Sequence, residues 1–326
     1  MKTRFTEKRT YTWLTVGAAV LTAFFVPVES LVAADSLEVS LADETCLQCE
    51  PLVLTIALHL DEPLRETEDP TERIAQQRRL RRRLRGILRR DGETVCTFPV
   101  FDTDFVASDD SGKTYEATCV AMITERPNPK ERVHRYYDTP GQYTLAVSGR
   151  ADKLESNEVL IAIVRAHGVD ADAMRLFRVD EPHAGALRML VQQEVDEETG
   201  RAFAELSELH PETPYGRYAV AGLALIRFQD TIAEHGDKGG TGVWEPVARE
   251  LAAAERLFTG KHPLREKVLF RLAQVRVVCG DYAGARKYLA AVKKDFPRGK
   301  LGSKAEDFEK KFSELEEQNR PNGEQP

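Results

Sequence analysis

The pattern of apolar and polar positions changes character twice along the chain. After a short basic start, residues 13–28 form an apolar run broken only by small or weakly polar residues. From residue 35 to about residue 166, short apolar or alternating runs are separated by turn residues, which is typical of β-strands. From residue 167 onward, apolar positions recur every three to four residues, which predicts helices.

The first 34 residues have the order of a secretory signal. Four basic residues precede the apolar run, and the small residues Ala33 and Ala34 follow it just before Asp35. This order predicts export, with cleavage near Ala34, to the periplasm or the cell exterior. An uncleaved membrane anchor is the alternative, although the run is short for a full membrane span.

Six short runs in the next part of the chain have the character of strands. Turn residues such as Asp91–Gly92 and Pro140–Gly141 lie between them. Short strands joined by turns predict an antiparallel β-sandwich over residues 35–166. The six runs are residues 37–41, 51–60, 94–101, 115–124, 142–147 and 159–164.

Residues 71–90 interrupt the strand pattern with nine arginines. Leucines and isoleucines recur there at helical spacing, which predicts a basic amphipathic helix inserted between strands. This helix either packs on the sandwich through its leucines or makes a weak contact with an anionic surface. The alternative is a hairpin in which residues 84–90 form a strand that turns at Asp91–Gly92. The arginines assigned to an anionic contact are Arg78, Arg79, Arg82 and Arg83.

One segment of the helical region has the spacing of a helical repeat. Pro263 and Pro297 are 34 residues apart, and two helical patterns lie between them around a turn at Gly280. Small and apolar residues on the facing sides predict close packing of the two helices. The residues expected at this packing are Leu272, Ala273, Gly280, Tyr282, Ala285, Leu289 and Pro297.

A second, weaker periodicity joins proline, glycine and alanine. The spacing Pro-x4-Gly-x2-Ala occurs at Pro211, Gly216 and Ala219, and again at Pro297, Gly302 and Ala305. It predicts that two helices begin in the same way after a proline joint. Between the two copies we expect helices over residues 215–235 and 244–258, with the glycine-rich residues 236–242 as the turn.

These helical features resemble tetratricopeptide repeats. The likeness lies in the Leu272–Ala273 pair, the Gly280-x-Tyr282-x-x-Ala285 motif and the final Pro297, whereas Arg276 stands at a usually apolar position. The resemblance implies a helical solenoid of stacked pairs, with a concave face that binds an extended peptide or a partner helix.

A shorter stretch resembles immunoglobulin-like domains. Residues 138–145, DTPGQYTL, are similar to the corner before a late strand of that fold, where a tyrosine hydroxyl bonds back to the backbone. Tyr143 would be that residue. Taken together, the chain resembles a tetratricopeptide-like protein of the bacterial cell envelope with an N-terminal immunoglobulin-like β-sandwich.

The expected organisation is therefore multidomain α+β. A signal peptide (residues 1–34) precedes an immunoglobulin-like sandwich (35–166) that carries the basic insertion (71–90). A tetratricopeptide-like helical domain (167–320) and a disordered tail (321–326) follow. The composition, 42% hydrophobic and 30% charged, is that of a soluble globular protein. The formal net charge of −7 argues against nucleic acid as a partner.

The cysteines change the expected chemistry of the first domain. Cys46, Cys49, Cys96 and Cys119 form an even set in one small exported domain, which predicts two structural disulfides. Three pairings are open, and a redox pair at Cys46–Cys49 or a zinc site are the alternatives. Cys279 lies in a helical pattern and is expected to be a buried thiol.

The sequence offers no catalytic, cofactor-binding or metal-binding motif. Its seven histidines lack metal-ligand spacing, and His210 and His262, each just before a proline, are expected to cap helices or face solvent. We therefore expect an exported, non-catalytic scaffold whose helical repeats bind a partner peptide or protein. The alternative is a module that binds the cell wall or a membrane surface through the sandwich and the arginine-rich segment. The oligomeric state stays open.

Overall fold

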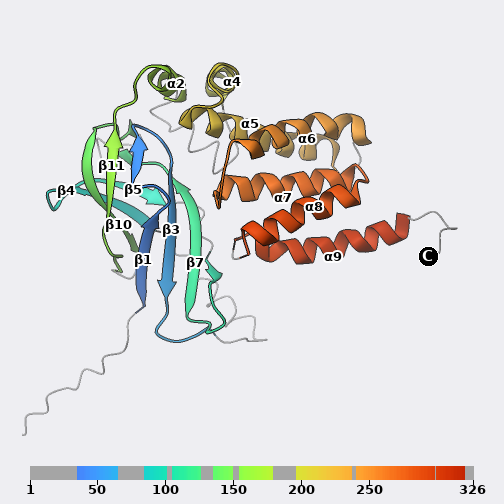
Figure 1. The fold of residues 1–326 in the computed structure, drawn as a ribbon, viewed down its shortest axis with the longest axis horizontal. Coiled ribbons are helices and arrows are strands. Elements are labelled where there is room, and N and C mark those ends of the chain that lie inside the picture. The colour runs from blue at the N-terminus through green and yellow to red at the C-terminus, as the bar shows by residue number, and fades with distance from the viewer. Residues whose placement is uncertain are drawn as a thin grey trace, which may run out of the picture. The chain divides into compact units, whose positions relative to one another are not determined.

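The computed structural model describes residues 35–64, 84–100, 105–125, 135–149, 154–178, 196–236, 240–297 and 299–319 (Figure 1). Its fold is mixed α+β, with a strand-rich first half and a helical second half, as the sequence predicted at this coarse level. In the described part of the chain, no helix is both long and apolar enough to cross a membrane.

Among the described residues, nine strands form one curled sheet. Its hydrogen-bonded order is β1-β3-β7-β5-β4-β10-β11-β2, with the short β6 paired to β7, and β8 and β9 form a separate pair. All pairs in the sheet are antiparallel except β11 with β2. The strands are β1 (Ser36–Leu41), β2 (Thr45–Leu47), β3 (Leu52–His59), β4 (Leu84–Arg90), β5 (Glu93–Val100), β6 (Val106–Ala107), β7 (Thr114–Ala121), β8 (Thr124–Glu125), β9 (Arg135–Tyr136), β10 (Gly141–Gly149) and β11 (Val159–Val164).

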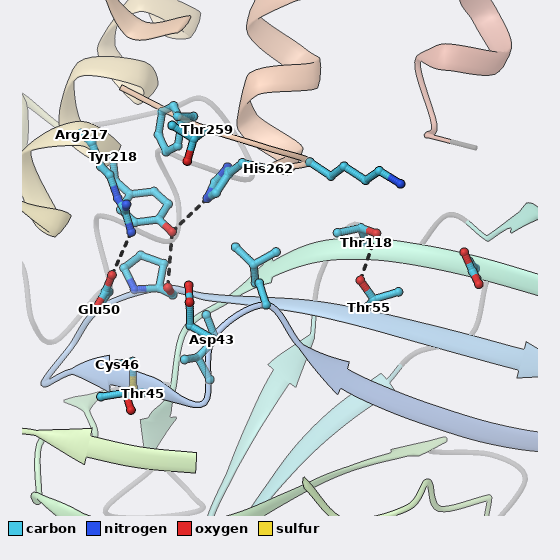
Figure 2. Close-up of a pocket in the computed structure, with 17 residues that line it drawn as sticks. Asp43, Thr45, Cys46, Glu50, Thr55, Thr118, Arg217, Tyr218, Thr259 and His262 are labelled. Atoms are coloured by element: carbon cyan, nitrogen blue, oxygen red, sulfur yellow. Dashed lines mark hydrogen bonds and ion pairs between the residues drawn. The ribbon is translucent and has the colours of Figure 1, made fainter. Parts of the chain in front are cut away.

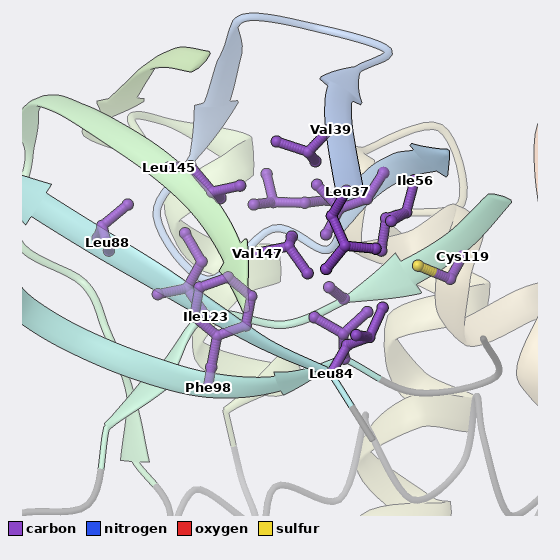
Figure 3. Packing of buried hydrophobic residues seen from close by; sticks show 14 of the residues in the cluster. Leu37, Val39, Ile56, Leu84, Leu88, Phe98, Cys119, Ile123, Leu145 and Val147 are labelled. Carbon is purple, nitrogen blue, oxygen red and sulfur yellow. The ribbon is translucent and has the colours of Figure 1, made fainter. Parts of the chain in front are cut away.

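The curl buries one face of the sheet on itself. Alternate residues of β3, such as Leu54 and Ile56, are fully buried, as the period of two requires. Leu37 from β1, Phe98 from β5 and Val147 from β10 meet them in the same core (Figure 3). We call this the sheet core.

The immunoglobulin-like sandwich is therefore a wrong prediction. A sandwich packs two sheets face to face, whereas the described strands of this core belong to a single sheet. Strand alternation shows that one face is buried, but it does not say whether a second sheet or the curl of the same sheet covers it. Here β1 comes close to the segment before β11, where the Asn157 side chain donates to the Val39 carbonyl (3.1 Å) and accepts from its amide (2.8 Å).

One feature of the immunoglobulin resemblance is confirmed on its own. The Tyr143 hydroxyl donates to the Thr139 carbonyl at 2.8 Å, which is the predicted corner bond. Arg90 lies over the Tyr143 ring at 4.5 Å and donates to the Pro140 carbonyl at 3.0 Å. This corner bond is therefore a local feature that occurs in this curled sheet as well as in immunoglobulin-like sandwiches.

The described part of the basic insertion, residues 84–90, is a strand and not a helix. Residues Leu84–Arg90 form β4, and β4 turns into β5 at Asp91 and Gly92, whose φ values of 52° and 81° suit a tight hairpin turn. The hairpin alternative is confirmed for this stretch. On β4, Arg89 pairs with Glu155 and Glu158, both at 2.6 Å. The arginines assigned to an anionic surface, Arg78, Arg79, Arg82 and Arg83, lie outside the described residues.

The structure does not contain the two disulfides expected among Cys46, Cys49, Cys96 and Cys119; all four are thiols. Cys46 faces the sheet core, whereas Cys49 faces a second core between sheet and helices. Within the described residues, strands β5 and β7 pair only at Val100 and Ala121. Cys96 and Cys119 precede these residues on antiparallel strands, so they lie in opposite directions from that pair, roughly 20 Å apart. A disulfide needs a Cα separation below about 7 Å.

Seven helices make up the described part of the second half. Asp196, Thr213 and Asp281 cap three of them through side-chain oxygens, as residues of these types often do. Consecutive helices from α4 to α9 pack on one another. The helices are α2 (Val169–Phe177), α4 (Glu197–Leu209), α5 (Pro214–His235), α6 (Gly240–Arg256), α7 (Pro263–Val278), α8 (Tyr282–Asp295) and α9 (Gly302–Asn319).

The tetratricopeptide resemblance is also a wrong identification. In such a solenoid each unit contacts only its neighbours. Here the first helices share a core with the sheet: Phe177 of α2 packs on Phe203 of α4 and Tyr215 of α5, at 5.8 and 5.4 Å between ring centres. Met122 and Tyr136 from the strand region belong to the same core. The helices also range from 9 to 22 residues, so they do not repeat a fixed unit.

The residues expected to pack at the repeat lie at the α7–α8 turn and on the two helices. Leu272 and Ala273 on α7 and Ala285 and Leu289 on α8 are fully buried. Gly280 forms the turn with a φ of 76°, which suits glycine. Tyr282 begins α8, and Pro297 follows its end.

The Pro-x4-Gly spacing has a steric cause. A Cβ atom on Gly216 would lie 1.8 Å from the His210 carbonyl oxygen, and one on Gly302 would lie 2.0 Å from the Phe296 carbonyl oxygen. His210 and Phe296 are the C-caps of α4 and α8, each directly before its proline. Each joint therefore brings the next helix against the last carbonyl of the previous one, where a side chain cannot fit.

Candidate binding cleft

The turn between β2 and β3 lies along the first turn of α5. The Tyr215 hydroxyl donates to the Gln48 carbonyl, Arg217 pairs with Glu50 at 2.9 Å, and the Tyr218 hydroxyl donates to the Pro51 carbonyl at 3.3 Å. The partners in all three contacts are 167 residues apart in sequence. The two segments therefore run side by side and join the sheet to the helical region.

A cleft of about 390 Å³ lies beside this junction (Figure 2). Its floor is the outer face of β3 and β7, and the loop between α6 and α7 forms the opposite wall. The β1–β2 segment and the start of α5 complete it. The lining residues are Ala42, Asp43, Thr45, Cys46, Glu50, Pro51, Leu52, Val53, Thr55, Glu116, Thr118, Arg217, Tyr218, Phe258, Thr259, Lys261 and His262.

The Glu50–Arg217 pair is largely shielded from water, with the two side chains 13% and 32% exposed. Burial raises the pKa of Glu50, while the Leu47 amide and the Arg217 charge oppose that rise. Both Glu50 oxygens are engaged, since the second accepts from the Leu47 amide at 2.8 Å. The Arg217 guanidinium also lies 5.3 Å from the Tyr218 ring centre. This pair fixes the β2–β3 turn to α5.

His262 and Tyr218 form a chain of hydrogen bonds that defines the histidine tautomer. His262 caps α7, accepting from the Leu264 amide through Nδ1 at 3.2 Å, so its proton is assigned to Nε2. Nε2 then donates to the Tyr218 oxygen at 3.1 Å, and Tyr218 donates to Pro51. Burial, with the nearby Arg217 charge, lowers the pKa of His262 to about 3. The imidazole is therefore neutral in the folded protein near pH 7.

Three titratable side chains of the cleft, those of Cys46, Tyr218 and His262, stay uncharged around neutral pH. Burial, with the charges of Glu50 and Cys49, raises the pKa of Cys46 to about 12, and burial raises the pKa of Tyr218. A general acid or base works best with a pKa near the operating pH. The Cys46 thiol, the Tyr218 phenol and the His262 imidazole all have pKa values far from neutral, so none of these three side chains is suited to proton transfer near neutral pH.

The cleft also offers several uncharged polar groups. Thr55 and Thr118 are cross-strand partners on the floor, with their hydroxyls 3.3 Å apart and exposed. Thr259 faces the cleft from the opposite wall (Figure 2). A hydroxyl can both donate and accept a hydrogen bond. In the described ranges, no group of three or more histidine, cysteine, aspartate or glutamate side chains could hold a metal ion.

The residues singled out from the sequence lie only partly at this cleft. Cys46 lines it, and Cys49 sits on the adjoining turn with a φ of 63°. His262 caps α7, which is one of the two roles that the sequence predicted for it. The remaining cysteines and the residues expected at the repeat packing are not among the residues that line it.

Sequence reasoning missed Glu50, Arg217 and Tyr218. Their partners are 167 residues away, and no local pattern marks such a pair. The available signal was weak: Tyr215-Gly216-Arg217-Tyr218 places two aromatic residues and an arginine on the first turn of a helix, directly after a proline joint.

No protein-family model matches this sequence, and no curated protein matches it. The tetratricopeptide and immunoglobulin resemblances therefore find no support in this comparison.

Proposed function

We propose that this chain is a non-catalytic binding protein whose cleft receives an extended segment of a partner protein. The observation that carries the proposal is the cleft itself. It combines a strand-face floor that carries two threonine hydroxyls with a thiol and an imidazole that stay uncharged around neutral pH. The sequence predicted that the partner binds a concave helical face. The proposed site is instead the cleft at the junction of the sheet and the helices.

The size and lining of the cleft support a polypeptide segment as the occupant. Its volume of about 390 Å³ is near the lower end of ligand pockets, so it has room for a few side chains. A peptide backbone offers both amides and carbonyls, which the hydroxyls of Thr55 and Thr118 can meet. Val53 and Phe258 supply apolar contact at the floor and the wall.

We also propose that the protein acts outside the cytoplasm. The support is the order of basic, apolar and small residues over residues 1–34, which lie outside the described residues. A partner in the cell envelope is consistent with that location.

Thr118→Arg is expected to abolish capture of the partner, because the long charged side chain fills the floor of the cleft. The measurement is crosslinked capture from envelope extract by the tagged full chain, with bound proteins identified by mass spectrometry. Thr97→Arg is the matched control, because Thr97 is also exposed on a strand but does not line the cleft. Both variants should melt as the unaltered chain does. Equal capture by both variants would refute the proposed site.

A further inference from the structure

We propose that the partner segment is acidic and that its carboxylates lie across a cationic depression next to the cleft. The inference rests on the proposed function and names the chemistry of the partner. The depression is formed by the ends of α6 and α8 and by the α6–α7 loop, and its volume is about 650 Å³. It shares Phe258, Thr259 and Lys261 with the cleft, so a segment that leaves the cleft past Lys261 reaches it directly.

Three of the four cations that line the depression form no ion pair with a described carboxylate. Arg265 is neutralised, since it pairs with Glu255 at 2.9 Å and with Asp295 at 2.7 Å. Arg265 and these two carboxylates together carry a net charge of −1, so the four cations and two carboxylates that line the depression leave it with a net charge of +2. Among the residues that the structure describes, no carboxylate forms an ion pair with Arg256, Lys261 or Lys294, and all three side chains are exposed. This positive surface stands out on a chain whose formal net charge is −7.

Helix dipoles account for two of these cations but not for the third. Arg256 lies in the last turn of α6 and Lys294 in the last turn of α8, where positive charge is favourable. Lys261 precedes the first residue of α7 by two positions, beside the positive end of that helix, where a cation is unfavourable. A bound carboxylate would offset this repulsion and pair with Lys261 at the same time.

The charges inside the cleft determine where the acidic residues of the segment lie. Asp43 and Glu116 line the cleft, so further carboxylates there would be repelled. The acidic part of the segment therefore belongs in the depression, and the uncharged part belongs on the threonine-lined floor. A long polyanion such as nucleic acid is disfavoured, because the negative chain repels it beyond this small patch.

The test uses the purified full chain and fluorescent peptides of one uncharged sequence followed by a run of glutamate, glutamine or lysine. We expect the glutamate peptide to bind more tightly than the other two. Its affinity should fall as ionic strength rises. The variant carrying Arg256→Gln, Lys261→Gln and Lys294→Gln should weaken its binding about fivefold to tenfold. The control carries Lys287→Gln, Lys304→Gln and Lys311→Gln, which removes the same charge from exposed helical positions away from the depression, and should bind as the unaltered chain does.

Each other outcome overturns a defined part of the inference. Equal binding of the glutamate and glutamine peptides, or equal loss in the two triple variants, would overturn the acidic partner. Full displacement by inorganic phosphate would assign the depression to a small anion instead of a peptide. If only this inference is wrong, partner capture is lost in the Thr118→Arg variant but is unchanged in the triple variant at the depression. Failure of the proposed function would leave capture insensitive to Thr118→Arg.

Discussion

Gly216→Ala is expected to lower the free energy of unfolding by about 3 kcal/mol, at the upper end of the cost of overpacking a rigid site. The added methyl would lie 1.8 Å from the His210 carbonyl oxygen, which is backbone and cannot rotate away. Helix propensity alone predicts the opposite sign, since alanine favours a helix by about 1 kcal/mol over glycine. The methyl should push the start of α5 away from His210. Because α5 also carries Arg217, this displacement should weaken the ion pair of Arg217 with Glu50. Denaturant unfolding measures the change.

Gly242→Ala is the matched control for this prediction. Gly242 is also near the start of a helix, α6, but no atom of the described residues lies within 4 Å of the position its Cβ would take. We expect a neutral or slightly stabilising effect there. Gly302→Ala should behave like Gly216→Ala, since its methyl would meet the Phe296 carbonyl in the same way. If Gly216→Ala were as stable as the control, the proposed cause of the Pro-x4-Gly spacing would be wrong.

His262→Asn is expected to destabilise the protein by about 1–3 kcal/mol at neutral pH, but by much less at pH 4. The loss at neutral pH comes from the hydrogen bond to Tyr218 and the ring contact with Phe258, 4.3 Å between centres. Asparagine retains the cap of α7, because it is among the best N-cap residues. The measurement is the free energy of unfolding of both proteins as a function of pH.

The pH dependence follows from where the proton binds. The pKa of His262 falls from 6.5 to about 3 on folding, so between these values the unfolded chain binds more protons. Protonation therefore removes stability from the unaltered protein as pH falls below about 6.5, and the asparagine variant lacks this loss. Each pKa unit is worth about 1.4 kcal/mol, so the difference between the proteins should shrink by up to about 3 kcal/mol by pH 4.

Other buried groups do not disturb the comparison. Burial raises the pKa of Glu50 and of Glu266, so these two groups lower the free energy of unfolding as pH rises. This pH dependence is opposite in sign to that of His262. Both are present in the unaltered chain and in the variant, so their contributions largely cancel in the difference. A difference that stays constant from pH 7 to pH 4 would show that His262 is not held neutral by burial.

The local parts of the fold could be predicted from the sequence because their causes are local. The alternation in β3, the turn at Asp91–Gly92 and the corner bond of Tyr143 depend on residues near one another in the chain. The Pro-x4-Gly spacing was visible for the same reason, although its steric cause required the structure.

The arrangement of these parts could not be predicted, because it depends on contacts between distant residues. One buried face per strand fits a sandwich and a curled sheet equally well, and the contact of Asn157 with Val39 spans 118 residues. Similarly, the even number of cysteines suggested disulfides, but strand register and the choice of core separate their thiols. The cleft combines both difficulties, since β3, β7, α5 and the α6–α7 loop each supply only part of it.

Site-specific photocrosslinking in the producing cell tests the binding cleft most directly. A small diazirine amino acid would replace Thr118 on the cleft floor in one strain and Thr97 in another; both positions are exposed on strands, and only the first lines the cleft. We expect a discrete crosslinked partner from position 118, with the crosslink mapping to one short segment of that partner, and none from position 97. The same products from both positions, or none from position 118 while the partner is still captured, would show that the partner binds elsewhere.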